Sequence, residues 1–419
     1  MFKTIDHGKV SYLLSVLLVV TLFLVVCGNN ETSSSDTNNS ESGVSEEEPI
    51  KFGFISSLSG GNASSGEPMK QGAELAIKHI NEDGGIMGRQ VELEVRDDKG
   101  SPEEAVKVVR DLQNNGVHFF LGVISSNVAL SLSPAMEELD SILITAAAHS
   151  DRLTGEDFNE HYFRVTDNAQ MRNYAGAKII AERYPDITEW ATFSPDYEYG
   201  KNTHDRFFEA LQEYNADVEL IHESWPAFGA SDFKNYITAV QNADPQGVFS
   251  SLYAGDAIVM SQQAASYNFY EGIDVFVNPS AERDIREQLG QNMHEEWGGL
   301  HYYAPAFDND INNRFVEDYK AEHGKEPIGF ASEAYNAMLA YKAAIEEAES
   351  TETQDVISKL EGIEFDSLTG TTTIREEDHQ AIKDVIWIHI VPAKGKTGWE
   401  VEETVIIPGD EVILPPSNH

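Results

Sequence analysis

The sequence is 419 residues long, which leaves room for two domains with substantial cores. Its 71 acidic residues against 29 basic ones give a formal net charge of -42, which argues against a nucleic-acid-binding protein because such a protein needs a basic surface. The single cysteine, Cys27, excludes a disulfide, a cysteine-ligated metal and a cysteine nucleophile from the rest of the chain.

Residues 1–27 are predicted to be a lipoprotein-type signal. Two lysines precede the uncharged apolar run SYLLSVLLVVTLFLVV, which ends at Cys27. A basic start followed by an apolar run of this length is typical of a secretory signal rather than of a full membrane span. The cysteine directly after the run resembles a lipidation site, but Val26 stands where a small residue is usual, so an uncleaved anchor is the alternative. Both interpretations place the remainder outside the cytoplasm and tether it to a membrane.

Residues 28–49 are predicted to form a disordered acidic tether. The segment has almost no apolar content and carries only acidic charges, so it cannot bury enough surface to fold. The acidity of the whole chain fits a high-salt habitat, where screening weakens self-repulsion between charges. An ordinary acidic protein outside the cytoplasm is the other interpretation, and the sequence leaves both open.

From residue 51 onward, short buried strands alternate with amphipathic helices. One helix start is explicit, because Ser101 suits an N-cap, Pro102 the first turn and Glu104 a capping box. Strands are predicted at 51–56, 91–96, 117–124, 141–148, 189–194, 218–222, 247–252 and 275–277. Helices are predicted at 69–80, 105–112, 126–139, 207–214, 312–323 and 329–348, with Ser231 capping a further one, and a β-rich tail at 371–414. This alternation predicts an α/β fold with two doubly wound sheets.

The stretch 117–149 is predicted to be a parallel βαβ unit that carries part of a ligand site. Ligands of open α/β sheets bind at the carboxyl ends of the strands. Ser126 stands at such an end, where its hydroxyl and the helix-terminal N–H groups would suit an anion, and the turn from Ala147 to His149 would lie beside it. The alternative is that Ser126 only caps the helix.

Several other motifs fail to support an enzyme, a cofactor or a metal. The loop SLSGGNASSGEP lacks the Lys-Ser/Thr end of a P-loop, and no G-x-S-x-G elbow accompanies Ser126. The HEEW segment at 294–297 lacks the second histidine of a zinc helix, and the loop that starts at Asp308 has Asn313 where a calcium loop needs glycine. We therefore expect no catalysis, no cofactor and no metal.

Motifs spread along most of the chain resemble a known family. They are the segment from SLSG to KVV at 57–109, LGVISS at 121–126, ITAAA at 144–148, PDYEYG at 195–200, SDF at 231–233 and EAYNAMLAYKAA at 333–344. These segments resemble the type I periplasmic solute-binding proteins of ABC importers, in the branch of the leucine/isoleucine/valine-binding proteins and their amide- and aromatic-acid-binding relatives. The resemblance covers residues 51–391.

The resemblance implies two Rossmann-like lobes joined by three hinge crossovers, closing on a solute between them. The first lobe would hold 50–166 plus 305–375, and the second 167–304 plus 376–419. The implied partners are a small solute, the permease subunits of the importer and the membrane that the N-terminus reaches. A ligand-sensing receptor of the same fold is the alternative.

The resemblance also implies ligand contacts. A carboxylate would be held by Ser126 and by the turn at Ala147 and His149, where relatives carry threonine in place of the histidine. A histidine there would make the grip pH-sensitive if it titrates near its unperturbed pKa. Tyr199 matches a cleft tyrosine of the second lobe, and Tyr253 lies at or beside another.

Two departures from the family pattern leave the solute open. Ser280 stands where several amino-acid binders place an acid for the α-ammonium, and Ser65 stands where they have an aromatic. Asp196, Glu282 and Glu333 are other acids for that role, with solvated or structural roles as their alternative. The solute is therefore a branched-chain or hydrophobic amino acid, another carboxylate such as an aromatic acid, an amide or a urea-type molecule.

Overall fold

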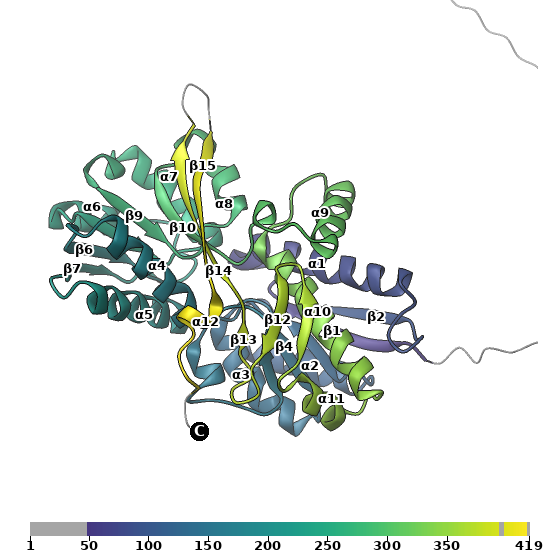
Figure 1. The fold of residues 1–419 in the computed structure, drawn as a ribbon. Helices are drawn as coiled ribbons and strands as arrows, with labels where there is room; N and C mark the ends of the chain where they lie inside the picture. The colour runs from purple at the N-terminus through teal and green to yellow at the C-terminus, as the bar shows by residue number, and fades with distance from the viewer. Residues whose placement is uncertain (1–47, 394–397, 417–419) are drawn as a thin grey trace, which may run out of the picture. The chain divides into compact units, whose positions relative to one another are not determined.

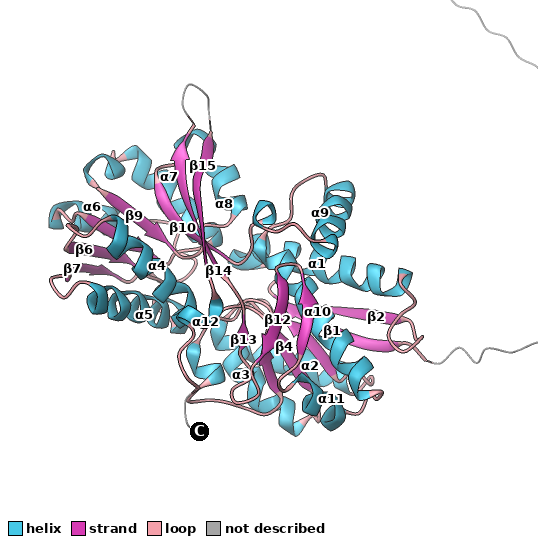
Figure 2. Ribbon diagram, in the orientation of Figure 1, coloured by secondary structure: helices cyan, strands magenta, loops and turns pink. Residues whose placement is uncertain are grey.

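The computed structural model describes residues 48–393 and 398–416, all of which belong to the compact unit Glu46–His419. The predicted signal, its Cys27 and nearly all of the predicted tether lie outside the described residues. The described part folds as α/β lobes built on two separate main sheets (Figures 1 and 2). No described helix combines the length and the apolar character needed to cross a membrane.

The first lobe is built on a five-stranded parallel sheet with the order β2-β1-β3-β4-β5. Its strands are β1 (Ile50–Ser56), β2 (Val91–Asp97), β3 (Phe119–Gly122), β4 (Ile142–Thr145) and β5 (Tyr162–Arg164). Because all five run in the same direction, their carboxyl ends meet at one edge of the sheet. Loops that follow the strands at this edge can therefore build a common site.

Helices cover both faces of this sheet because its strands are apolar on both sides. Phe52 and Phe119 pack with α1 (Ala63–Glu82) and α10 (Gly329–Ala348), whereas Phe120 faces α2 (Pro102–Gln113) and α3 (Ser126–Glu138). The remaining elements of this lobe are η1 (Gly60–Asn62), η2 (Asp151–Thr154), α9 (Asp310–His323), α11 (Thr353–Leu360) and a small antiparallel sheet of β11 (Glu364–Ser367), β12 (Gly370–Ile374) and β13 (Ala381–Ile382).

The second lobe is built on a seven-stranded mixed sheet with the order β15-β14-β10-β9-β8-β6-β7. Its parallel strands are β6 (Glu189–Phe193), β7 (Glu219–Ser224), β8 (Gly247–Ser250), β9 (Val275–Asn278) and β10 (Glu296–Leu300), and the antiparallel edge is β14 (Val385–Pro392) with β15 (Trp399–Ile407). Its helices are α4 (Ala169–Arg183), α5 (Glu198–Tyr214), α6 (Lys234–Ala243), α7 (Ala254–Ser266), α8 (Arg283–Leu289) and α12 (Gly409–Val412), with short turns η3 (Phe269–Gly272), η4 (Gly290–Asn292) and η5 (Ala304–Ala306). Apolar side chains fill both faces of this sheet as well, so it too is doubly wound.

Three crossovers join the lobes, as the resemblance implies, and buried side chains tie them to one another. The chain crosses between β5 and α4, between β10 and α9, and between β13 and β14. Gln380 lies near the third crossover and accepts a hydrogen bond from Arg164 at 2.7 Å. It also donates a hydrogen bond to the carbonyl of Thr166, in the first crossover, at 2.8 Å. Lys383 donates to the His301 carbonyl of the second at 3.2 Å. The crossovers therefore form one connected floor.

The sequence predicts the alternation and the helix at 329–348 well, and some local expectations are wrong. The third crossover lies between β13, which ends at Ile382, and β14, which begins at Val385. Phe233, and not Ser231, is the N-cap of α6, which begins at Lys234. Ser125 is the N-cap of α3, so Ser126 is its first helical residue. Strand β10 was not expected from the sequence, although it is an interior strand of the second sheet, between β14 and β9.

Candidate functional site: an interlobe cavity

A small cavity of about 20 Å³ lies where the carboxyl ends of strands from both lobes meet. Its walls are Ile124, Ala147, His149 and Phe330 from the first lobe, Tyr197, Tyr199, Tyr253 and Ser280 from the second, and His301 from the second crossover. One water needs about 10–15 Å³, so the lobes are closed tightly around this space. A molecule with several heavy atoms would fit this space only if the lobes moved apart, as a hinge would allow.

Five of the seven predicted ligand contacts line this cavity: Ala147, His149, Tyr199, Tyr253 and Ser280. Ser126 and Ser65 do not line it. Ser126 is buried at the start of α3, and its hydroxyl accepts a hydrogen bond from the backbone N–H of Ser150 at 3.3 Å. Ser65 is buried in the first turns of α1, and its hydroxyl oxygen has no hydrogen-bond partner.

His149 brings a polar edge to the first-lobe wall. It follows β4 and is 3% exposed, and its Nε2 has no hydrogen-bond partner, with the Asp167 carboxylate 4.0 Å away. Burial, and then the positive charge of Arg172, hold the pKa of His149 well below its usual value. The imidazole is therefore neutral at neutral pH. The condition for a pH-sensitive contact, titration near the unperturbed pKa, is therefore disfavoured by burial.

The second-lobe wall is aromatic, and its hydroxyls are paired with one another. The hydroxyls of Tyr197 and Tyr253 share a hydrogen bond at 2.9 Å, and those of Tyr199 and Ser280 share one at 2.7 Å. Burial raises the pKa of each of the three phenols, so they stay uncharged. Phe228 stacks on Tyr253 with the ring centroids 5.8 Å apart. This wall offers flat apolar surface and few free polar atoms.

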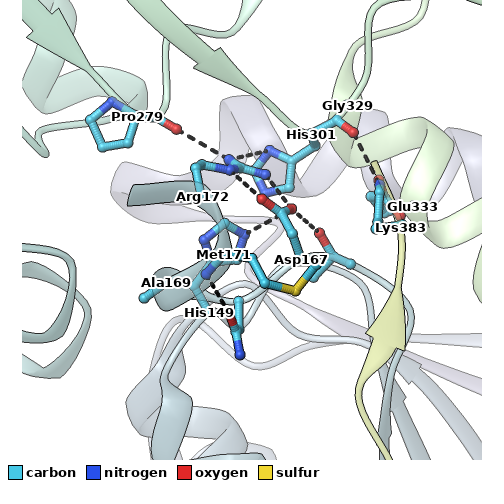
Figure 3. A network of polar contacts seen from close by, with 12 residues as sticks. His149, Asp167, Ala169, Met171, Arg172, Pro279, His301, Gly329, Glu333 and Lys383 are labelled. Atoms are coloured by element: carbon cyan, nitrogen blue, oxygen red, sulfur yellow. Dashed lines mark hydrogen bonds and ion pairs between the residues drawn. The ribbon is translucent and has the colours of Figure 1, made fainter. Parts of the chain in front are cut away.

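Beneath the cavity, a buried charged network occupies the crossovers (Figure 3). Arg172 donates to both oxygens of the Asp167 carboxylate, at 2.7 and 2.5 Å, and to the Pro279 carbonyl at 3.1 Å. Burial alone would raise the pKa of Asp167, but the Arg172 guanidinium holds it far below its usual range. Lys383 pairs with Glu333 in the same region. The Asp167–Arg172 pair is therefore ionised, and it ties α4 to the loop that follows β9.

Four wall residues were not predicted from the sequence: Ile124, Tyr197, His301 and Phe330. Tyr197 lies inside the motif PDYEYG, so the position of that motif after β6 was an available signal. His301 directly follows β10, and without that strand nothing places it at a carboxyl end. Across residues 48–393 and 398–416, no group of three or more His, Cys, Asp or Glu side chains could hold a metal ion.

The chain is similar to known proteins of one family. The model of the family described as "Periplasmic binding protein" matches residues 49–396. "Leu/Ile/Val-binding protein homolog 3" from Brucella melitensis is 26% identical over 335 residues, which are 78% of this chain and 87% of that protein. The "Leucine-, isoleucine-, valine-, threonine-, and alanine-binding protein" from Pseudomonas aeruginosa is 26% identical over 332 residues, with 78% and 86% covered.

A solved structure shares the fold. It is a solute-binding protein of an ABC transporter from Rhodopseudomonas palustris BisB5, in complex with 3,4-dihydroxy benzoic acid. The TM-score is 0.78 at 20% identity, over 87% of this chain and 98% of that one. The family match spans both lobes, all three crossovers and every residue of the cavity wall. The chain therefore belongs to the periplasmic binding protein family and has its type I fold.

Proposed function

We propose that this protein is the solute-binding component of an ABC importer, which captures a small polar or carboxylate-bearing solute between its lobes and delivers it to the permease. A branched-chain or hydrophobic amino acid is the favoured solute, in line with what the names of the two relatives say of those proteins. The observation that carries the proposal is the small cavity between the lobes, to which both lobes and a crossover contribute. A solute bound there would contact both lobes, and a hinge opening would release it.

The first-lobe side of the site suits a carboxylate. The first N–H groups of α3 have no partner within the helix, and the side chain of its N-cap, Ser125, does not cap them. The Ser126 hydroxyl and the turn from Ala147 to His149 adjoin this helix start. Neutral donors at a helix N-terminus favour an anion. We place the carboxylate here once the lobes part.

The second-lobe side suits an apolar or aromatic group. Tyr197 and Tyr253 present ring surface to the cavity, and Ile124 and Phe330 face it from the first lobe. Burying a side chain of leucine size among such groups is worth about 1.5–3 kcal/mol. Because the wall is so aromatic, an aromatic acid is the second candidate solute. The Rhodopseudomonas palustris relative, whose structure holds 3,4-dihydroxy benzoic acid, supports this alternative.

Contacts beside the cavity join the closed lobes. The Ser150 hydroxyl donates to Glu198 at 2.6 Å, and Arg206 donates to Asp151 at 2.7 Å. Each pair links the η2 region of the first lobe to α5 of the second. We infer that a permease recognises the composite surface of the closed form, and that residues 1–27, through Cys27, tether the protein to the membrane. We expect no catalysis, and a lack of ester or amide hydrolysis by the purified protein would support this.

The test is a ligand screen on the full-length protein in mild detergent, by thermal shift and then calorimetry. The panel holds branched-chain and aromatic amino acids, benzoate derivatives, short amides and urea. A solute at 100 times its Kd adds about 2.7 kcal/mol to the stability of the folded state, so the right solute raises Tm clearly. Ser126→Ala should weaken binding of a carboxylate, and Ser131→Ala on the same helix is the matched control. If no panel member raises Tm, the proposed function is wrong.

A further inference from the structure

His301 is a buried residue of the cavity wall, and only one of its two ring nitrogens has a hydrogen-bond partner. It follows β10, is 3% exposed, and lies with its ring centroid 4.9 Å from that of His149 and 4.8 Å from that of Phe330. Its Nδ1 lies 2.8 Å from Glu282 Oε1, whereas its Nε2 is buried and has no hydrogen-bond partner. A buried polar atom without a partner costs about 1–3 kcal/mol, so the vacant edge needs an explanation.

The tautomer of His301 follows from its partner. Glu282 accepts hydrogen bonds from the backbone N–H groups of His301 at 3.1 Å and of Gly329 at 3.0 Å, in addition to the imidazole. Burial alone would raise the pKa of Glu282, but these hydrogen bonds lower it, so the carboxylate is ionised. An ionised carboxylate only accepts, so Nδ1 carries the proton and donates it. In the neutral ring, Nε2 is then a hydrogen-bond acceptor.

His301 stays neutral because of what surrounds it. Burial lowers its pKa, and the Arg172 guanidinium, with Nη1 3.4 Å from Nδ1, lowers it further. Arg172 does not satisfy the ring, because Nη1 and the protonated Nδ1 are both donors. Nε2 therefore remains an acceptor, on the edge of the ring away from Glu282.

Glu282 fixes the orientation of the ring. Its carboxylate accepts from the imidazole and from two backbone amides. The nearby Arg172 and Arg286 guanidinium groups offset its negative charge. A solute group is therefore recognised at Nε2 through the hydrogen bond that this atom lacks, and not through a net charge at the ring.

We propose that His301, oriented by Glu282, receives an N–H donor group of the solute and so restricts the solute to carboxylates that also carry an amino or amide N–H. The inference rests on the proposed function and names the solute class of the same site. The inference also explains how a solute amino group can be bound although Ser280 stands where several amino-acid binders have an acid. The Ser280 hydroxyl is hydrogen-bonded to Tyr199 and does not take the place of that acid. Glu282 acts through the imidazole and is a positioning residue.

The experiment uses matched pairs of probes that differ only in the nitrogen: L-leucine with 4-methylpentanoate, L-phenylalanine with 3-phenylpropanoate, and 2-aminobenzoate with benzoate. Calorimetry on the full-length protein at pH 7.5 should show at least a tenfold tighter Kd for the nitrogen-bearing member of the pair that fits. His301→Phe should remove this preference, so that the two members of the pair bind with Kd values within about threefold of each other. His301→Gln, which keeps an acceptor, should retain part of it, and His118→Phe outside the cavity is the control.

The outcomes separate the two proposals. If no probe binds, the proposed function fails together with the inference. If both members of a pair bind equally, or if only the nitrogen-free members bind, the inference fails and the proposed function stands. A preference that survives in His301→Phe also overturns the inference. Because that variant could fail to fold, ¹⁵N NMR of the imidazoles in the unsubstituted protein gives a second test, in which a protonated Nε2 on His301 would contradict the assignment.

Discussion

The two faces of the cavity differ in how their polar atoms are satisfied. On the second-lobe face, hydroxyls are paired within the lobe, Tyr197 with Tyr253 and Tyr199 with Ser280. On the first-lobe face, His149 Nε2 is buried without a hydrogen bond. The hydroxyls of the second-lobe face are therefore hydrogen-bonded, whereas the first-lobe face has a buried nitrogen without a partner.

This difference indicates how the two faces share the work of binding. An unsatisfied buried atom gains a full hydrogen bond when a solute arrives, whereas a paired hydroxyl only exchanges one bond for another. We therefore expect the first-lobe face to supply most of the polar binding energy. The second-lobe face supplies ring surface, which becomes useful when the lobes close. We propose that the solute contacts the first lobe before the lobes close.

The largest expected effect comes from breaking the floor beneath both faces. Arg172→Met leaves the buried Asp167 carboxylate without its cation, and losing one partner of such a pair costs about 3–5 kcal/mol of unfolding free energy. Urea denaturation of the variant and the unsubstituted protein measures this. Arg110→Ala, which removes an exposed pair with Glu138, should cost no more than about 1 kcal/mol. If both variants lose the same unfolding free energy, the buried pair contributes no more to stability than the exposed pair.

A pH series tests the neutral imidazoles of the cavity. The folded-state pKa values of His149 and His301 are lowered, so below about pH 6.5 the unfolded chain binds protons that the folded protein does not. Stability is fully present above that pH and falls as the pH drops below it, by up to about 1.4 kcal/mol per pH unit for each histidine. Urea denaturation at pH 7.5, 6.5 and 5.5 checks the slope.

The matched variant for this series is His149→Leu, which has no imidazole at that position. Its stability should fall less steeply between pH 6.5 and 5.5 than that of the unsubstituted protein. If the unfolding free energy of both proteins falls equally steeply with pH, His149 has the same pKa in the folded and unfolded chains. Its burial then has no energetic consequence.

Binding by single variants compares the faces directly. Once a solute is identified, His149→Leu should weaken its binding about tenfold, or about 1.4 kcal/mol, because the first-lobe face loses its free polar edge. Tyr199→Phe should weaken binding less, since that hydroxyl is engaged by Ser280. Calorimetry gives both values. A larger loss in Tyr199→Phe would reverse the assignment of polar recognition to the first lobe.

Most of the architecture could be predicted from local pattern, whereas part of the cavity could not. Ser101 is the N-cap of α2, as predicted. The prediction was possible because the residues that form this cap are neighbours in the sequence. Strand β10 is different. Its Gly298 and Gly299 weaken the strand pattern, but a Cβ on Gly298 would lie 2.5 Å from that of Ala281, and one on Gly299 would crowd Pro279. These glycines allow close packing that only the folded chain shows.

The pairing of His301 with Glu282 could not be predicted from the sequence either, because it too depends on the folded chain. The sequence marked Glu282 as one of three acids for the solute ammonium, and in the structure its carboxylate contacts an imidazole 19 residues further on. Contacts of this kind depend on two strand ends, those of β9 and β10, that become neighbours only in the sheet. Spacing in the chain carries no such information.

The smallest expected effect is the coupling between Tyr197 and Tyr253 on the second-lobe face. Their hydroxyls are 2.9 Å apart, so each single change to phenylalanine leaves the other hydroxyl without its partner, and the double change removes both polar atoms. A double-mutant cycle on unfolding free energy should therefore give a coupling of about 0.5–1.5 kcal/mol, with the double variant less destabilised than the sum of the singles. Additive losses would mean that the two hydroxyls are not paired. The second-lobe face would then resemble the first, and the contrast between them would disappear.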